Sequence, residues 1–292
     1  MDLFNNKKGR DLASMPGTCE ALVMQAVLNN SLQLAPGKAS GVCGDPHIQK
    51  WDGNYFDYHG ECDLVMLNAP DFGGVHDGLH IQIRTKIRYA YSYITSAAIK
   101  IGNDVLEVAS FGQYMVNKIA AADLTEASLS GFEVTHQIVD EKRHSFMIQV
   151  GRVSLAISTL KDIVSVHVLR GEDNVTGRWF ANSTGLMGSF PTGEMLARDG
   201  STVLHDPNDF AQEWMVQSSE PQLIDRLTHH HTVCVLPAQG VKMTRRLGEG
   251  IGLRDAEEAC SRFHRAGNQQ AMEACISDVI AMNDLDIAAI SY

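Results

Sequence analysis

The cysteines are the first residues of this sequence that could do chemistry. Six are present, at Cys19, Cys43, Cys62, Cys234, Cys260 and Cys275. They permit three disulfides, in fifteen possible pairings. None stands in a Cys-x-x-Cys motif, so the spacing typical of zinc sites and of thioredoxin-like redox sites is missing. An even cysteine count without such motifs favours a disulfide-bonded protein of an oxidising, extracellular compartment.

Three asparagines begin triplets that could be N-glycosylated: Asn29, Asn174 and Asn182. Single triplets of this kind arise by chance, but together with the cysteines they favour secretion. The N-terminus argues in the other direction, because residues 1–4 run directly into polar and basic residues and no signal peptide is present. The chain is therefore either intracellular, or a fragment or incomplete precursor of an extracellular or cell-surface protein. We expect the second.

Composition argues against several classes of function. The net charge is −11 and 44% of the residues are hydrophobic, as in an ordinary soluble globular protein. An acidic surface disfavours nucleic acids and anionic membranes, both of which attract Lys and Arg. No apolar run is long enough to span a bilayer, so we expect no membrane insertion and no nucleic-acid partner. The Gly-x-Ser-x-Gly, P-loop and Gly-x-Gly-x-x-Gly signatures are absent, so we expect no enzyme.

The middle of the chain has the pattern of strands. Apolar and polar residues alternate in Leu79–Arg88, Phe146–Val150, Val153–Ile157 and Val164–Val168. Alternation predicts strands with one face buried and the other in water, which is typical of antiparallel sheets. Glycine-containing turns separate these runs, and many short strands with turns between them predict a β-sandwich.

Helical patterns flank this region. Residues 19–28 predict a short helix in an N-terminal flank, and Pro207–Trp214 predicts another. Near the C-terminus two amphipathic segments carry one cysteine each, Cys260 and Cys275, which could link them as a helical hairpin. The fold class is therefore mainly β, an antiparallel sandwich with a short helical flank and a small helical hairpin. The predicted domains are residues 1–40 (flank), 41–218 (β domain) and 219–292 (linker and hairpin).

Short motifs follow one another in a fixed order along the β domain. They are Cys43-Gly44-Asp45-Pro46-His47, Trp51-Asp52-Gly53, Gly60-Glu61-Cys62, Gly185-Leu186-Met187-Gly188-Ser189-Phe190 and Trp214-Met215-Val216. In this order they closely resemble the opening and closing motifs of the von Willebrand factor type D domain, over about residues 42–217. The resemblance implies a β-sandwich of that type in a structural or adhesive extracellular protein.

The resemblance also implies disulfide partners. In the family, the cysteine at the position of Cys62 pairs with one just beyond the closing Trp, and Cys234 is the candidate here. Closing so long a loop would stabilise the fold by roughly 4–5 kcal/mol on the chain-entropy model. The alternative is two buried, free thiols. The family's first cysteine pairs with one in the closing motif, where this chain has Met187. Cys43 has therefore lost its usual partner, and Cys19 is left for it by elimination.

A calcium site is a further implication of the resemblance, and here it is degenerate. The family binds Ca²⁺ with the Asp of the opening turn, which is Asp52, and with a loop rich in Asn and Asp. In this chain that loop is Ser189–Met195 and has almost no carboxylates. Because Ca²⁺ needs six to eight oxygens, we expect weak or absent binding and no other cofactor. If Ca²⁺ nevertheless binds tightly, Glu194 and Asp199 are the first candidates for replacement ligands. The alternative role of Asp52 is to hydrogen-bond its own turn without a metal ion.

The segment Gly44-Asp45-Pro46-His47 implies one further chemistry. In some proteins that the chain resembles, this tetrapeptide breaks between Asp and Pro. The Asp45 carboxyl can attack its own carbonyl carbon, Pro46 provides a tertiary-amide leaving group, and His47 can supply a proton in mildly acidic conditions. The alternative is that Pro46 fixes the backbone before the first strand while Asp45 caps a turn.

We therefore expect a non-enzymatic structural, adhesive or binding module of a secreted or cell-surface glycoprotein, such as a matrix or mucus-like protein. Its partners would be other extracellular proteins or glycans. Covalent multimers of the family use additional cysteines and Cys-x-x-Cys motifs, and this chain has none of the latter, so covalent multimerisation is not expected. The alternative function is a self-processing protein that cleaves its own Asp45–Pro46 bond. A β-sandwich hydrolase has no nucleophile–base signature in its favour.

Overall fold

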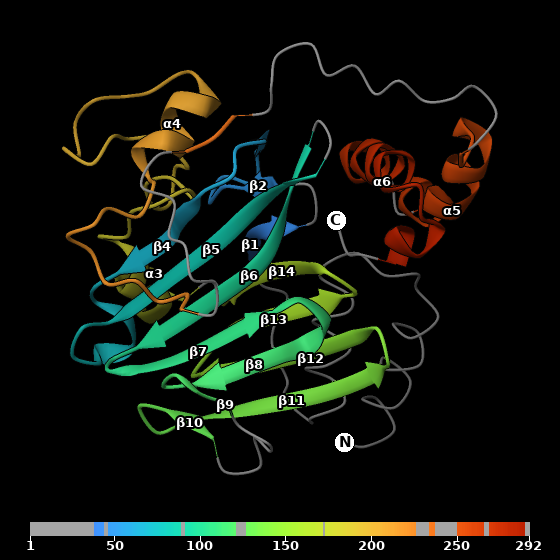
Figure 1. Ribbon diagram of the computed structural model, residues 1–292. Helices are drawn as coiled ribbons and strands as arrows, with labels where there is room; N and C mark the ends of the chain where they lie inside the picture. The colour runs from blue at the N-terminus through green and yellow to red at the C-terminus, as the bar shows by residue number, and fades with distance from the viewer. Residues whose placement is uncertain are drawn as a thin grey trace. The chain divides into compact units, whose positions relative to one another are not determined.

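A computed structural model of the chain (Figure 1) describes residues 38–43, 46–88, 91–120, 127–171, 173–225, 234–236, 250–265 and 269–289. The described residues fall into two compact units, a β unit within Pro36–Lys242 and a helical unit within Met243–Tyr292. The predicted helix at 19–28 lies outside the described residues.

Two antiparallel sheets make up the β unit. The eight-stranded sheet has the order β10 (Ser128–Leu129), β11 (Phe132–Asp140), β12 (Arg143–Val150), β13 (Val153–Leu160), β14 (Ile163–Arg170), β1 (Lys38–Cys43), β2 (His47–Gln49), β3 (Tyr55–Asp57). The six-stranded sheet has the order β4 (Asp63–Ala69), β5 (Leu79–Arg88), β6 (Tyr91–Ile101), β7 (Asp104–Ala109), β8 (Gln113–Val116), β9 (Ile119–Ala120). The mainly β, antiparallel fold class is confirmed, as is the predicted strand Leu79–Arg88.

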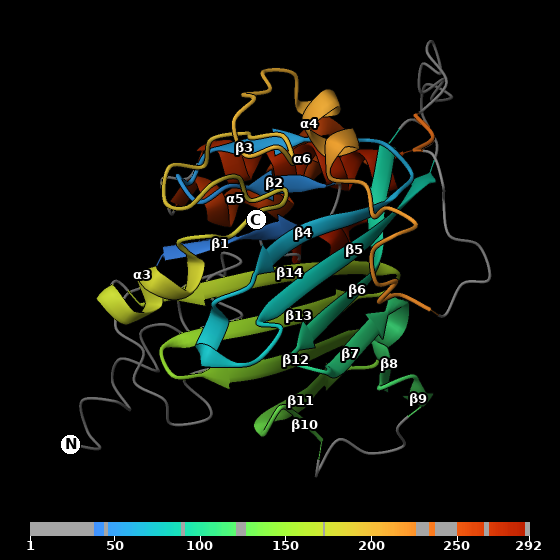
Figure 2. The same cartoon turned by 90° about the vertical axis from the view of Figure 1, so that its left-hand side faces the viewer.

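One continuous hydrophobic core lies between the two sheets, which form two layers in Figure 2. Ile81 and Ile83 enter it from β5, and Ile157 and Val166 enter it from β13 and β14; all four are fully buried. Ile157 and Val166 are directly opposite each other in the ladder, so their side chains leave the sheet on the same face. The alternating pattern of the sequence is therefore the pattern of this core.

Part of the outer face of β5 is not in water, contrary to the expectation from its alternation. Gln82 is only 1% exposed. Residues 221–224 lie across this face: Gln82 Nε2 donates to Pro221 O at 2.8 Å, and Leu223 N donates to Gln82 Oε1 at 3.0 Å. Leu223 also packs against Ala98 of β6. Alternation reports the polarity of a face, and a polar face can be buried where its side chains find partners.

Two short helices complete the described β unit, α3 (Asn174–Phe180) and α4 (Pro207–Glu213). Each begins after an aspartate whose carboxylate accepts two backbone N–H groups of the first turn: Asp173 for α3 and Asp206 for α4. Pro207 occupies the first turn of α4, where its missing N–H is no loss. The short helix predicted from Pro207 is confirmed. The 3-10 turns η1 (Phe72–Gly74) and η2 (Ser110–Gly112) lie between strands.

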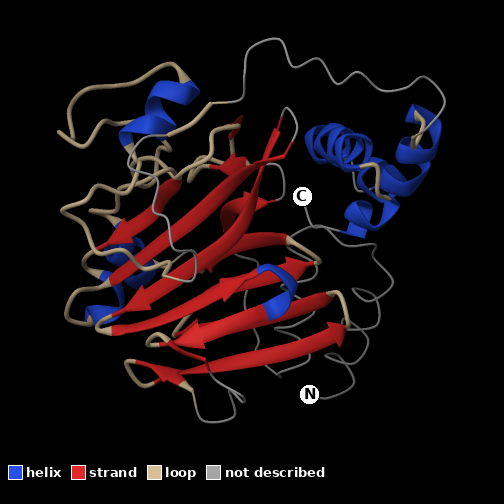
Figure 3. Cartoon of the chain, viewed as in Figure 1, coloured by secondary structure: helices blue, strands red, loops and turns tan. Residues whose placement is uncertain are grey.

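The described secondary structure of the helical unit is helical throughout (Figure 3). It consists of α5 (Leu253–Arg265), α6 (Gln269–Met282) and the 3-10 helix η3 (Leu285–Ala289). Among the side chains that the structure describes here, the buried apolar ones are Ala256, Cys260, Cys275, Val279, Ile287 and Ala288. In both units, none of the described helices has the length and apolar composition needed to cross a membrane.

Candidate functional site

The opening and closing motifs of the sequence lie side by side in the β unit. We call the contact between residues 46–66 and 185–217 the motif junction. Within it, Leu186 N donates to Val65 O at 3.1 Å and Val65 N donates to Trp214 O at 2.8 Å. Segments separated by more than a hundred residues in sequence are thus joined through their main chains, which makes the junction the candidate functional site.

Met187 lies at the centre of the motif junction. It is fully buried, and its carbonyl accepts a hydrogen bond from Trp51 N at 3.1 Å. The family resemblance places a cysteine at this position, as the partner of Cys43. Here an apolar side chain fills the space in the core, and main-chain hydrogen bonds fasten the segment. The expected partner Cys19 lies outside the described residues, so the Cys19–Cys43 pairing stays a prediction.

Aromatic rings surround the opening turn. Trp51 packs against Phe180 and Phe190, with ring centroids 4.9 and 5.3 Å apart. The guanidinium of Arg170 lies over Phe190 at 4.8 Å, within the range of a cation–π contact. Because Trp51 comes from the opening motif and Phe190 from the closing one, these rings strengthen the motif junction.

A disulfide closes the opening motif onto the end of the β unit. Cys62 is bonded to Cys234, with Cα atoms 4.9 Å apart, across 172 residues of sequence. Two main-chain hydrogen bonds flank it, from Glu61 N to Val235 O at 2.7 Å and from Val235 N to Glu61 O at 3.2 Å. The second disulfide, Cys260–Cys275, has a Cα separation of 5.9 Å and joins α5 to α6. These are two of the three pairings that we expected, the first from the family resemblance and the second from the helical hairpin.

Position 60 of the Gly-x-Cys motif must be a glycine for a steric reason. A Cβ at this position would lie 2.0 Å from the Tyr58 hydroxyl, so only glycine lets the ring fit. Tyr58 is fully buried, and its hydroxyl lies 3.0 Å from Cys62 Sγ. Burial raises the pKa of Tyr58 to about 12, so the hydroxyl stays neutral and can donate to the sulfur.

The expected calcium ligands are already engaged by the chain itself. Asp52 Oδ1 accepts from Asn54 N at 3.0 Å, and Oδ2 accepts from Asn54 Nδ2 at 2.7 Å. Lys50 Nζ lies 3.4 Å from Asp52 Oδ2 and donates to the carbonyl of Gly193 at 2.9 Å. Ca²⁺ needs six to eight oxygen ligands, and here the Lys50 ammonium group lies between two oxygens that could serve, Asp52 Oδ2 and Gly193 O. The residues present do not fit a calcium ion.

The two candidate replacement ligands are not part of this arrangement. Asp199 accepts from Thr202 Oγ1 at 2.6 Å and from two backbone N–H groups of its own turn, and these bonds hold its pKa well below the usual range. Glu194 is exposed, and its main chain forms hydrogen bonds with Ser189, Thr192 and Leu196. Within the described ranges, no three His, Cys, Asp or Glu side chains come together as a metal site.

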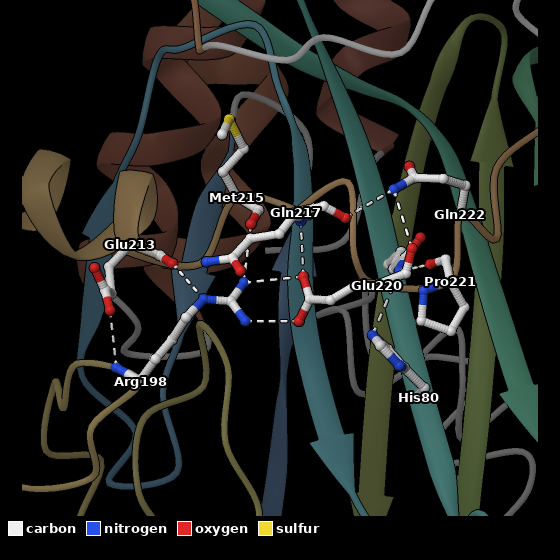
Figure 4. Close-up of polar contacts among 9 residues, drawn as sticks. His80, Arg198, Glu213, Met215, Gln217, Glu220, Pro221 and Gln222 are labelled. Carbon is white, nitrogen blue, oxygen red and sulfur yellow. Dashed lines mark hydrogen bonds and ion pairs between the residues drawn. The ribbon is translucent and has the colours of Figure 1, made fainter.

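Sequence reasoning missed a polar cluster at the edge of the motif junction (Figure 4). Arg198 donates to both oxygens of Glu220, at 2.6 and 3.2 Å, and to the carbonyls of Glu213 and Met215 at 2.7 and 2.8 Å. Its guanidinium also lies 4.8 Å from the ring centroid of Trp214. One arginine thereby fixes the segment that follows α4. The only sequence signal was a charged pair 22 residues apart, which is too weak to select from many such pairs.

His47 is paired across the β2–β3 ladder. Its Nδ1 lies 2.6 Å from Asp57 Oδ1, and the two residues are directly opposite each other. The hydrogen bond with His47 holds the pKa of the Asp57 carboxyl below its usual value, against the effect of burial. Pro46 is buried beside it, and its carbonyl accepts from Tyr58 N at 3.4 Å. Asp45, the third residue of the expected self-cleavage motif, lies outside the described residues.

The glycosylation triplets differ in how they lie. Asn174 is the exposed first residue of α3. Asn182 is also exposed, but its side-chain amide donates to Asp71 Oδ2 at 2.7 Å. Asn29 lies outside the described residues.

In comparisons with known proteins, no model of a protein family and no curated protein matches the chain.

Proposed function

We propose that this chain is a non-enzymatic structural or adhesive module of a secreted or cell-surface glycoprotein, with a von Willebrand factor type D domain at residues 41–218. Its partners are other extracellular proteins or glycans. The observation that carries the proposal is the motif junction, in which motifs separated by more than a hundred residues meet in the order that the resemblance implies. A disulfide beside the junction supports an oxidising compartment, where such bonds persist.

The arrangement suits a passive module. The opening and closing motifs are engaged with one another: Trp51 packs against Phe190, Trp51 N donates to Met187 O, and Val65 N donates to Trp214 O. Groups that hold each other in this way stabilise a rigid scaffold, whereas catalysis requires groups directed at a bound substrate. Exposed loops on a rigid scaffold are a usual place for contacts with partners.

Expression through a secretory pathway tests the proposal. The chain, fused to a signal peptide, is purified from the medium and digested without reduction, and its peptides are identified by mass spectrometry. We expect peptides linked through Cys62 and Cys234, and glycan on Asn174. Binding is then measured on arrays of matrix proteins and glycans, with the heat-unfolded chain as control. Free thiols at Cys62 and Cys234 in secreted protein, or an array without any retained ligand, would count against the proposal.

Self-cleavage at Asp45–Pro46 is the second candidate function, and the His47–Asp57 pair favours it. A carboxylate that accepts a hydrogen bond from an imidazole fixes the ring and stabilises its protonated form, which is what a proton donor beside a scissile bond needs. Asp57 would be a positioning residue, since it acts through His47.

Incubation at about pH 5.5, followed by reducing gel electrophoresis, tests this candidate. If it holds, fragments of the sizes given by a break after Asp45 accumulate. Asp45→Asn abolishes the fragments. Asp57→Asn slows their formation and shifts the pH profile of cleavage to lower pH, because His47 then loses the negative charge that favours its protonation. A chain that stays whole for days would exclude the candidate.

A further inference from the structure

We infer that the ammonium group of Lys50 is a built-in cation that closes the motif junction where a divalent metal ion would otherwise be needed. The Lys50 bridge consists of Lys50 Nζ, the carboxylate of Asp52 and the main-chain carbonyl of Gly193. It joins the opening turn to the closing loop, which are 143 residues apart in the sequence. The inference goes beyond the proposed function and does not depend on which partner the module binds.

The position of the ammonium group is the first argument. The Lys50 side chain is 14% exposed, whereas lysines are mostly exposed. A charge withdrawn from water must be compensated by oxygens, and two are supplied: Gly193 O at 2.9 Å and Asp52 Oδ2 at 3.4 Å. Carboxylate and carbonyl oxygens are also the ligands of hard divalent cations. Lysine and metal would therefore compete for the same oxygens.

The shape of the closing loop is the second argument. Gly193 has φ +68°, and a Cβ there would lie 2.6 Å from Asp52 Cγ. Only glycine therefore lets the loop come close enough for its carbonyl to reach the ammonium group. The loop is also tied to itself, because Gly193 N donates to Ser189 O at 2.7 Å. This close approach leaves little room between carboxylate and carbonyl for an additional hydrated ion.

The electrostatics of Asp52 are consistent with the bridge. Burial raises the pKa of this carboxyl, but the hydrogen bonds from Asn54 and the charge of Lys50 outweigh burial, and the pKa lies below the ordinary value. Asp52 therefore stays ionised and paired over the physiological range. Because the cation is covalently part of the chain, the junction does not vary with the calcium concentration around the protein.

Replacing Lys50 by methionine tests the inference, since methionine keeps an unbranched chain and removes the charge. The matched control is Lys86→Met, at an exposed position on β5. Thermal unfolding is measured for the whole chain and both variants, in millimolar CaCl2 and in EDTA. Hydrogen exchange at the Gly193 amide is measured in parallel. Asp52→Asn is the second variant, because it removes the negative charge from a side chain near the surface and keeps an acceptor for Asn54.

We expect the unmodified chain to melt at the same temperature in CaCl2 and in EDTA. Lys50→Met should lower the melting temperature by roughly 2–4 °C and speed exchange at Gly193, while Lys86→Met should do neither. Asp52→Asn should speed exchange at Gly193 in the same way. Two results would overturn the inference: an unmodified chain that CaCl2 stabilises and EDTA destabilises, or exchange at Gly193 that neither Lys50→Met nor Asp52→Asn changes.

Discussion

Among the described residues, the β unit and the helical unit each contain one disulfide, but the two bonds have different surroundings. Cys62–Cys234 spans 172 residues, and Cys62 is one of many buried residues in a core to which both sheets contribute. Cys260–Cys275 spans 15 residues in a unit whose described buried apolar residues are few, and two of them are these cysteines. In the first unit the bond involves a small share of a large core, whereas in the second its two cysteines are a large share of the described buried residues.

This difference follows from size. A domain buries a larger fraction of its surface as it grows, and chains below about 40 residues usually need disulfides, metals or partners to fold. The unit that contains α5 and α6 comprises Met1–Ala35 and Met243–Tyr292, and it is smaller than the β unit, which comprises Pro36–Lys242. Removing each disulfide should therefore have a different consequence, even though both lose a covalent link.

The largest change in free energy is expected for Cys62→Ser combined with Cys234→Ser. A closed loop of this length contributes about 5 kcal/mol on the chain-entropy model. The β unit should still fold, because the core and the main-chain bonds of the motif junction remain. The chain's three tryptophans all lie in the β unit, so urea unfolding followed by their fluorescence reports on it alone. Loss of the native fluorescence without denaturant would show that this fold depends on its disulfide after all.

Next in size is the buried ion pair that joins β4 to β5. Arg84 donates to both carboxylate oxygens of Asp63, at 2.5 and 2.6 Å, and each side chain is 3% exposed. Arg84→Met removes one partner and leaves a buried carboxylate, which should lower the free energy of unfolding by about 4 kcal/mol. The double variant Asp63→Leu with Arg84→Met should be less destabilised than the single one. Equal losses would mean that packing, and not charge, dominates at this site.

For the helical unit, Cys260→Ser with Cys275→Ser is the decisive change. Closing a loop of about 15 residues contributes about 3 kcal/mol, which is less than in the β unit but a larger share of a small unit's free energy of unfolding. We expect the unit to lose its helices, seen as a fall in far-UV helical circular dichroism. Tryptophan fluorescence is the internal control and should not change. A variant that keeps its helical signal would remove the contrast between the two units.

Part of this picture could be predicted from sequence, because the signals were local. Alternation predicted the strand Leu79–Arg88, and the return of a helical pattern predicted the short helix that begins at Pro207. The hydrophobic spacing also marked the helical segments that contain Cys260 and Cys275. In each of these cases the physical cause lies within a few residues of its effect.

The remainder could not be predicted, because its cause lies far away in the sequence. Burial of Gln82 on the outer face of β5 depends on residues 221–224, and nothing near Gln82 in the sequence indicates them. Lys50 drew no attention, since a lysine beside a turn is ordinarily solvated and its partner Gly193 contributes only a main-chain carbonyl. The junction's polar contacts thus became visible only once the strands were placed.

The smallest expected effect concerns pH and one histidine of the β unit. His80 lies on β5 near the Arg198 cluster (Figure 4), and burial lowers its pKa from 6.5 to about 4; Glu220 opposes the shift, while Lys100 and Arg198 add to it. The unfolded chain binds a proton near pH 6.5 and the folded chain only near pH 4. The stability due to neutral His80 is therefore complete above pH 6.5 and is lost as the pH falls from there towards 4.

Between pH 7.5 and 5 the β unit should lose about 2 kcal/mol through His80, measured by urea unfolding with tryptophan fluorescence. His80→Gln should remove most of this dependence, while His205→Gln, at an exposed histidine, should leave it unchanged. The pKa of His136 is also lowered, by burial and by the nearby His144, so His136 should account for part of the pH dependence that remains in His80→Gln. The carboxylates with lowered pKa titrate below this window, so they do not mask it. If His80→Gln keeps the full pH dependence of the free energy of unfolding, burial of His80 on β5 is not what makes this unit sensitive to acid.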